Sequence, residues 1–304
     1  MGGSGRPDIV KPKGVADELR RAEERSAKSQ VEAEVSGLIA SLLAKFNDRD
    51  RESVQAHLDA IKSALGKDID GTVDLVLGGS VAKHTYVDGL SDVDALVVLD
   101  SCELSELPPS EARSYLAEKL RDRFPKTPVR EGGIAVTVEF SDIDIQLVPV
   151  VSCRNKIKIG DPGSGRWSLV DPKAFSDILT RVNVHAGRKV VPVIKVVKSI
   201  LDKLPEHQRL SGYHVESLAV EIFRDYAGPY ATKSMVKQFF QESARLVLEP
   251  IRDATGQSVH VDDDLGSSGS LERRVISDSL SRITRRMRNA DAAQSLDEWR
   301  EILE

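Results

Sequence analysis

The sequence is poor in the features that mark secreted, membrane-spanning and strongly nucleic-acid-binding proteins. Cys102 and Cys153 are the only cysteines in 304 residues, which excludes a disulfide framework and fits a reducing cytoplasm. No apolar run reaches the roughly 18 residues that a transmembrane helix needs. Basic residues do not outnumber acidic ones, and the net charge is −5. We therefore expect a cytoplasmic protein with no membrane partner and no stable nucleic-acid partner.

The N-terminal residues also lack the apolar core of a signal peptide. The opening stretch "MGGSGRPDIVKPKG" is rich in Gly, Pro and charge, so residues 1–20 are predicted to form a flexible leader. Helical periodicity then extends from about residue 15 to residue 65. Its apolar stripe includes Val35, Leu38, Ile39, Leu42 and Leu43.

The rest of the chain divides into a mixed part and a helical part. Strand signals occur in "TVDLVL", "DVDALVVL", "IAVTVEF" and "IDIQLVPVV", and the last two are predicted to form a hairpin. Helical patterns dominate from residue 171 onward. The boundary lies at the loop "KIGDPGSGRW", which lacks the Gly-Lys-Ser/Thr ending of a P-loop. We predict an α/β (α+β) core over residues 21–165, including the N-terminal helix, and a helical C-terminal lobe over residues 166–304.

Two closely spaced carboxylates enter the second predicted strand. In "SDVDALVVL", Asp92 and Asp94 project on the same face of the strand. Their charges repel each other, and burial increases that cost. A divalent cation relieves both problems, and Mg²⁺ prefers carboxylate oxygens together with substrate phosphates. The pair therefore predicts a metal-dependent site that acts on phosphates.

A two-metal site needs a third carboxylate, which we expect from the strand "IDIQLVPV". Asp144 lies inside this strand, where aspartate is unfavourable on structural grounds. Asp142 lies in the predicted hairpin turn, where aspartate is ordinary. We therefore favour Asp144 over Asp142 as the third ligand.

A glycine turn ends the first predicted strand. Gly78, Gly79 and Ser80 precede "VAKHT", a segment long enough for one helical turn. Glycine lets backbone N–H groups approach an anion closely, and a helix start favours negative charge. Such a turn is commonplace by itself. Followed by "SDVD" and a strand carrying a carboxylate, it predicts a loop that binds a triphosphate beside two metal ions.

Together, the residues "GGSVAKHTYVDGLSDVDAL" resemble the signature of the polymerase-β-type nucleotidyltransferases. The segments "VVPVIKVVKSILDKL", "LSGYHVESLAVEIF" and "LEPIRDATGQSV" resemble the helical part of oligoadenylate synthetase and cyclic GMP-AMP synthase-like enzymes. Within these families the chain is most similar to the CD-NTases of bacterial CBASS antiphage systems. The resemblance implies a polymerase-β-like core with a mixed sheet, and an active site in the cleft between core and lobe.

The resemblance assigns roles to the acidic residues. Asp92, Asp94 and Asp144 would hold two Mg²⁺ (or Mn²⁺) ions. Relatives often place the distal aspartate three residues before a proline, where this chain has Gln146. Asp144, two residues earlier, shares a strand face with Gln146, so the expected geometry is preserved.

The loop residues receive roles in the same way. Gly79 and Ser80 would bind the triphosphate of the donor nucleotide, and Ser80 also suits a helix cap. Thr85 matches a recurrent threonine of the family, whereas His84 stands where many relatives have a small residue.

Residues of the helical half complete the candidate site. Lys195 and Lys198 share one helix face, and a lysine on the equivalent helix of the family contacts the donor's phosphates. Lys198 is our first candidate and Lys195 the second, with a snorkelling surface lysine as the alternative for either. Ser211 would reach the triphosphate or cap the next helix. Tyr213 would stack on a base or pack in the core.

Several conspicuous residues are predicted to be structural. His214, Glu216, Trp167 and Trp299 are assigned to packing. Three adjacent aspartates, Asp262, Asp263 and Asp264, are assigned to a solvated loop, because adjacent side chains point in different directions.

The resemblance implies that a ribose hydroxyl attacks the α-phosphate of ATP or GTP and that pyrophosphate leaves. A second turnover would close a cyclic dinucleotide or lengthen an oligomer, which a separate effector would sense. One alternative is a nucleic-acid-directed enzyme of the CCA-adding or poly(A) type, against which the acidic net charge argues. The other is a catalytically inactive nucleotide-binding module, against which the three aspartates argue.

Overall fold

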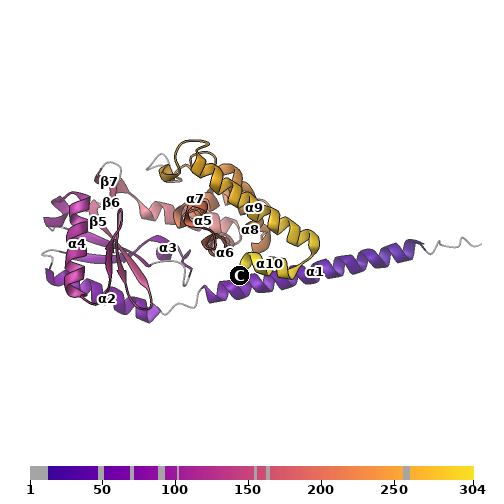
Figure 1. Cartoon of the computed structure of the whole chain (residues 1–304), viewed down its shortest axis with the longest axis horizontal. Coiled ribbons are helices and arrows are strands. Elements are labelled where there is room, and N and C mark those ends of the chain that lie inside the picture. Colours follow the sequence, from indigo (N-terminus) through magenta and orange to yellow (C-terminus); the bar gives the residue numbers. More distant parts are fainter. Residues whose placement is uncertain are drawn as a thin grey trace, which may run out of the picture.

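The computed structural model describes residues 13–46, 51–68, 72–87, 93–100, 103–153, 156–161, 165–255 and 261–304. It contains a core built on one sheet and a helical lobe beside it, with the indigo helix α1 (Lys13–Lys45) running along the lobe and projecting beyond it (Figure 1). The predicted division into a mixed front part and a helical back part is confirmed.

The core is organised around a mixed seven-stranded sheet. Five strands follow the order β1-β2-β5-β4-β3, and β6 and β7 extend it from β5. Strands β2 and β5 are parallel, and the other pairs are antiparallel, including the predicted β4–β5 hairpin. The strand bounds are β1 (Thr72–Leu77), β2 (Val93–Asp100), β3 (Val129–Glu131), β4 (Val136–Glu139), β5 (Asp144–Cys153), β6 (Lys156–Asp161) and β7 (Arg166–Val170).

One face of the sheet is covered by α2 (Arg51–Asp68) and α4 (Pro109–Arg123). Val93, Ala95, Val97 and Leu99 alternate along β2 and are buried against these helices in one apolar cluster. Because successive side chains of a strand point to opposite faces, Asp94 points to the other face. The short helix α3 (Gly79–Ala82) lies between the sheet and the lobe (Figure 1).

The lobe consists of helices packed around a second apolar cluster. Its helices are α5 (Pro172–His185), α6 (Val190–Asp202), α7 (Gly212–Phe223), α8 (Thr232–Leu246), α9 (Leu271–Ala293) and α10 (Leu296–Leu303). The predicted boundary at residue 165 falls inside the β6–β7 hairpin, since β7 pairs with β6 as part of the sheet.

The N-terminal helical region resolves into two helices with different partners. Val35, Ile39 and Leu42 of α1 are buried in the cluster of the lobe, whereas α2 packs on the sheet. No helix within the described ranges combines the length and the apolar character needed to cross a membrane.

A buried lysine fastens α1 to the lobe. The Lys233 Nζ atom, on α8, contacts Glu32 Oε2 of α1 at 2.5 Å and Asp291 Oδ1 of α9 at 2.9 Å. Trp299 Nε1 also donates to Asp291 Oδ1, at 3.1 Å, and Lys237 pairs with the same carboxylate. Burial acts to raise the pKa of Asp291, but the hydrogen bonds from Lys237 and Lys233 lower it below its usual range.

This carboxylate gives a prediction about acid stability. A lowered pKa in the folded state means that Asp291 stabilises the protein above its unfolded pKa of about 4, and that this contribution disappears as pH falls through the folded pKa. We expect Asp291→Asn to lower the free energy of unfolding at pH 7. The difference in that free energy between variant and wild type should become smaller below about pH 4. Urea unfolding of both proteins, at pH 7 and below about pH 4, measures this difference. A difference that stays constant with pH would contradict the assignment.

Candidate active site

The predicted phosphate loop is bound tightly to β2. The Gly78 N–H donates to the Asp94 carbonyl oxygen at 2.8 Å, and Gly79 has φ of 49°, in the left-handed region that favours glycine. A Cβ atom built at Gly79 would lie 1.7 Å from Asp94 Oδ2. Only glycine therefore allows the loop backbone to lie against this carboxylate.

Replacing Gly79 by alanine tests how closely the loop backbone lies against the Asp94 carboxylate. We expect Gly79→Ala to displace either the loop or the Asp94 side chain, and to lower nucleotide binding or turnover by about 10- to 100-fold. Gly37→Ala is the matched control, because a Cβ atom at Gly37 in α1 meets nothing within 4 Å. Circular dichroism and turnover of both variants measure the effect. Equal activity of the two variants would argue against the placement of the loop.

Asp94 is a half-buried carboxylate with few partners. Among the described residues, the backbone N–H of Ser80 donates a hydrogen bond to its Oδ2 atom, at 3.2 Å. Burial raises the pKa of Asp94, while the Ser80 bond and the charges of Lys83 and Lys198 oppose that rise. A cation bound at this carboxylate would favour the ionised form.

Asp144 lies on the same face of the sheet as Asp94. In the parallel β2–β5 register Asp94 is opposite Gln146, and Asp144 precedes Gln146 by two residues at the start of β5. Asp92 lies outside the described residues. The described residues contain no group of three or more acidic, His or Cys side chains able to hold a metal ion.

Asp142 points toward a different part of the core. Its Oδ2 accepts a hydrogen bond from Ser53 Oγ at 2.5 Å, and its Oδ1 lies 2.8 Å from His57 Nε2. Ser53 and His57 belong to α2, which covers the face opposite Asp94. The hydrogen bonds from Ser53 and His57 lower the pKa of Asp142. Asp142 is therefore engaged with α2, on the face of the sheet opposite Asp94.

Thr85 and Lys198, both predicted, meet at the carboxylate of Glu216. Thr85 Oγ1 donates to Glu216 Oε1 at 2.5 Å, and Lys198 Nζ lies 2.8 Å from the same oxygen. Lys198 Nζ also donates to the Thr85 carbonyl oxygen at 3.2 Å. Lys83, in the turn after α3, pairs with Glu216 Oε2. The Thr85 N–H donates to the Ser80 carbonyl oxygen at 2.9 Å, and the Ser80 N–H donates to Asp94, so this group of residues is joined to the loop that contacts Asp94. The charges of Lys83, Lys198 and Glu216 all act on the pKa of Asp94.

The other predicted lobe residues have separate environments. Lys195 is buried, and desolvation together with the nearby charge of Lys198 lowers its pKa. Ser211 caps α7, because its Oγ accepts the His214 N–H at 3.3 Å. Tyr213 is 40% exposed, and its ring packs on Phe175 with centroids 5.2 Å apart. The Lys83 ammonium lies 5.4 Å from the centre of the Tyr213 ring, which places this aromatic surface next to the site.

Lys83 and Glu216 belong to this group of residues, although the sequence patterns gave neither of them a role at the site. The pattern around Lys83 predicts only a short helical turn, although the position of Lys83 three residues after Ser80 places both on one face of that turn. Glu216 was assigned to packing, and the structure does bury it, at 1% exposure. Its partners Thr85 and Lys83 come from the core, more than 130 residues earlier, so no local pattern reveals them.

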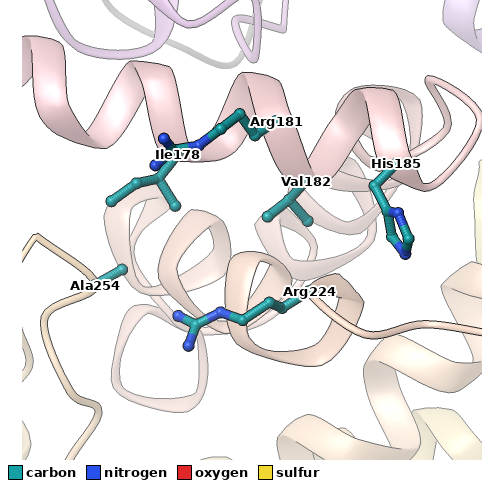
Figure 2. A pocket seen from close by; sticks show the side chains of 6 residues that line it. All are labelled: Ile178, Arg181, Val182, His185, Arg224 and Ala254. Atoms are coloured by element: carbon teal, nitrogen blue, oxygen red, sulfur yellow. The ribbon is translucent and has the colours of Figure 1, made fainter.

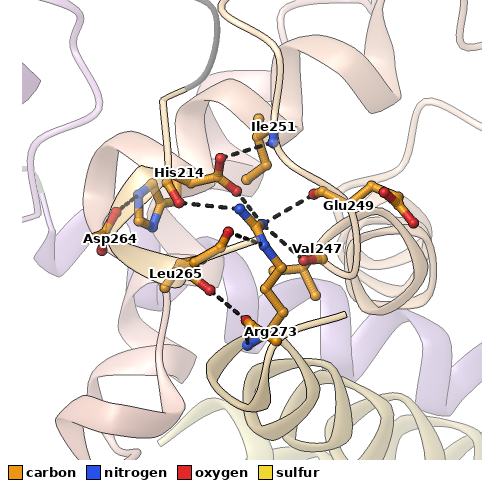
Figure 3. A network of polar contacts seen from close by, with 10 residues as sticks. His214, Val247, Glu249, Ile251, Asp264, Leu265 and Arg273 are labelled. Carbon is orange, nitrogen blue, oxygen red and sulfur yellow. Dashed lines mark hydrogen bonds and ion pairs between the residues drawn. The ribbon is translucent and has the colours of Figure 1, made fainter. Parts of the chain in front are cut away.

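The assignment of Asp262 to a solvated loop is wrong. Asp262 is fully buried, and its Oδ2 pairs with Arg273 Nη1 of α9 at 2.5 Å. Figure 3 shows Arg273 bonded to the carbonyl oxygens of Val247 and Glu249. The neighbouring Asp264 is exposed, as predicted, and its Oδ1 atom lies 3.4 Å from His214 Nε2. Trp167 and Trp299 pack against the two apolar clusters, as predicted. Each also donates a hydrogen bond from its indole N–H.

A separate cavity of about 380 Å³ lies between α5, the end of α7 and residue 254. Figure 2 shows Arg181 and Arg224 on opposite sides of it. None of the predicted site residues lines this cavity. Its lining consists of Ile178, Arg181, Val182, His185, Arg224 and Ala254. The cavity is therefore distinct from the site at Asp94.

Comparison with protein families decides the affiliation. Residues 32–183, half of the chain, match the Second Messenger Oligonucleotide or Dinucleotide Synthetase (SMODS) domain. The chain belongs to this family. It is a CD-NTase, that is, a nucleotidyltransferase, and the resemblance seen in the sequence is confirmed.

Solved structures of CD-NTases share the fold. The Bradyrhizobium diazoefficiens CdnG with GTP aligns with a TM-score of 0.67 and 13% identity, covering 88% of this chain and 94% of that chain. The Escherichia coli CdnC with ATP aligns with a TM-score of 0.61 and 17% identity, covering 83% and 90%. The E. coli DncV bound to 3′-deoxy GTP aligns with a TM-score of 0.63 and 14% identity, covering 99% and 93%. A search of curated proteins found no match.

Proposed function

We propose that this SMODS-family enzyme joins nucleoside triphosphates into a cyclic di- or oligonucleotide second messenger and releases pyrophosphate. The observation that carries the proposal is the contact between the Gly79–Ser80 loop and the Asp94 carboxylate. A loop that offers backbone N–H groups to an anion lies directly beside a carboxylate able to hold a cation. Such a pairing suits a metal-bound triphosphate.

The side chains divide the work between metal and phosphate. Asp94 and Asp144, with Asp92, would hold two Mg²⁺ or Mn²⁺ ions through carboxylate oxygens, the donor type that these ions prefer. Bound there, such ions would supply charge stabilisation for the attacking and leaving oxygens. Gly79 and Ser80 would position the triphosphate.

The lobe would supply the remaining contacts with the nucleotide. Lys198 would neutralise phosphate charge, with Thr85 holding that lysine in place and Lys195 one turn away. Ser211, which caps α7, would lie near the phosphates, and Tyr213 would offer its ring to a base. ATP and GTP are the expected substrates, and their binding by solved relatives supports this expectation.

We place the enzyme in bacterial antiphage defence of the CBASS type, in the cytoplasm, where a separate effector protein would sense the product. Membership of the SMODS family and the resemblance of the sequence to the CBASS CD-NTases support this role.

The experiment is incubation of the purified protein with all four NTPs and Mg²⁺ or Mn²⁺, with products resolved by chromatography and mass spectrometry. A phosphatase-resistant cyclic or short oligonucleotide, absent with Asp94→Asn, supports the proposal and identifies the bases. Turnover only after addition of tRNA or another nucleic acid would instead identify a nucleic-acid-directed enzyme.

A further inference from the structure

We propose that Glu216 is a positioning residue for the donor triphosphate: its carboxylate holds one lysine from the core and one from the lobe, Lys83 and Lys198, beside the Gly79–Ser80 loop. The proposal rests on the proposed function, which makes a triphosphate the ligand of that loop. Glu216 itself is placed in contact with the lysines and not with the substrate.

Glu216 joins the two parts of the molecule. Glu216 lies on α7 of the lobe, and Lys198 lies on the neighbouring helix α6. Lys83 and Thr85 follow α3 of the core, and both reach the Glu216 carboxylate. Its Oε1 atom therefore contacts both Thr85 of the core and Lys198 of the lobe, and its Oε2 atom contacts Lys83 of the core.

Two lysines offset the burial of this carboxylate. Desolvation acts to raise the pKa of Glu216, but the charges and hydrogen bonds of Lys198 and Lys83 outweigh it and lower the pKa. A buried carboxylate is costly unless it is paired. The two lysines satisfy that need, and the carboxylate in turn fixes where two long, flexible side chains place their ammonium groups.

The charges of this group do not balance. Two ammonium groups share the Glu216 carboxylate, so these three side chains carry one excess positive charge, which acts on Asp94 beside the phosphate loop. Lys83 also lies over two aromatic rings, 5.2 Å from the centre of Phe175 and 5.4 Å from that of Tyr213. The rings and the carboxylate together hold the Lys83 ammonium on the side where the loop and Asp94 lie.

The consequence is a preorganised cationic site for an anion. Without Glu216, Lys83 and Lys198 repel each other, and each gains freedom to turn toward solvent. Binding of a triphosphate would then have to order both side chains, which weakens binding. The contribution of the β- and γ-phosphates to the binding affinity should therefore fall, while the contribution of the base and sugar should be unchanged.

The test uses two variants and one control. Glu216→Gln keeps the size of the side chain and removes its charge. Lys83→Gln leaves Glu216 paired with Lys198 alone, so one buried positive charge still balances one buried negative charge. This variant should therefore fold even if Glu216→Gln does not. The control is Glu221→Gln, on the same helix, where the carboxylate is exposed and pairs only weakly with Arg224, at 3.6 Å.

Isothermal titration with the NTP that wild type binds, and with its monophosphate, separates the contributions. We expect Kd for the NTP to rise about tenfold or more in both variants, with KM rising more than kcat falls. Kd for the monophosphate should change much less, and Glu221→Gln should match wild type. Unchanged NTP affinity in both variants, or an equal loss for the monophosphate, overturns the inference. Wild type that neither binds NTP nor forms product overturns the proposed function, and with it this inference.

Discussion

Asp94→Asn should lower the rate of nucleotidyl transfer by about 100- to 1000-fold. Asparagine has the size of aspartate, and its carbonyl oxygen can still accept the Ser80 N–H that now bonds Oδ2. The variant therefore keeps the packing of the loop and loses only the charge. That charge is what a divalent cation needs from this side chain. Initial rates of product formation from NTPs with Mg²⁺ measure the loss.

Asp142→Asn is the matched control in the same core. Asp142 is held by Ser53 and His57 of α2 on the other face of the sheet. Its exposed ion pair contributes little to stability, and its replacement should leave the rate within about twofold of wild type. A rate loss in Asp142→Asn as large as that in Asp94→Asn would mean that the site has been placed on the wrong face. Full activity in Asp94→Asn would remove that residue from the metal site.

The core of the site was predictable because its signals are local. Gly79 and Asp94 are 15 residues apart in one strand–turn–strand unit, and the period of two along a strand fixes the face on which Asp94 lies. The structure adds a reason for Gly79 that the pattern alone does not contain. Its missing Cβ atom leaves room for the Asp94 carboxylate.

The contacts across the core–lobe boundary were not predictable in the same way. Thr85 was recognised only as a recurrent residue of the family, and its hydroxyl finds its partner 131 residues later, at Glu216. That pairing depends on how α7 docks against the turn after α3, which neither segment encodes by itself. The same holds for α1. Its apolar stripe is predictable from the sequence, but the sequence does not show that this stripe packs against the lobe.

The aspartate run near α9 shows a different failure. Alternation of side chains along residues 262–264 argues against one ligand shared by the three carboxylates. It does not reveal that one of them points inward to a buried arginine. Arg273 is fully buried, and its guanidinium donates to the carbonyl oxygens of Val247, Glu249 and Gly266 as well as to Asp262. A cation placed among carbonyl groups needs an anion, and Asp262 provides it.

This pair gives the largest expected effect on stability. Asp262→Asn leaves the buried Arg273 without its counter-charge and weakens the bond from the Ile251 N–H to Asp262 Oδ1, now 2.9 Å. Breaking a buried ion pair from one side costs about 3–5 kcal/mol. We expect a loss of that size in the free energy of unfolding, measured by urea denaturation at pH 7. Asp297→Asn, which removes an exposed pair with Arg300 at 3.2 Å, should cost less than about 1 kcal/mol.

The combination of both substitutions separates charge from packing. With Arg273→Met added to Asp262→Asn, no buried charge is left unpaired, so the double variant should be less destabilised than the sum of the single variants. A strictly additive double variant would mean that the arginine stabilises the protein through its carbonyl contacts alone. Because Asp264 of the same loop lies beside His214 on α7, the loop that this pair holds is also in contact with the helix that carries Tyr213 and Glu216. Loss of the Asp262–Arg273 pair should therefore make the positions of Tyr213 and Glu216 on α7 less fixed, while Asp94 and its glycine loop stay in place.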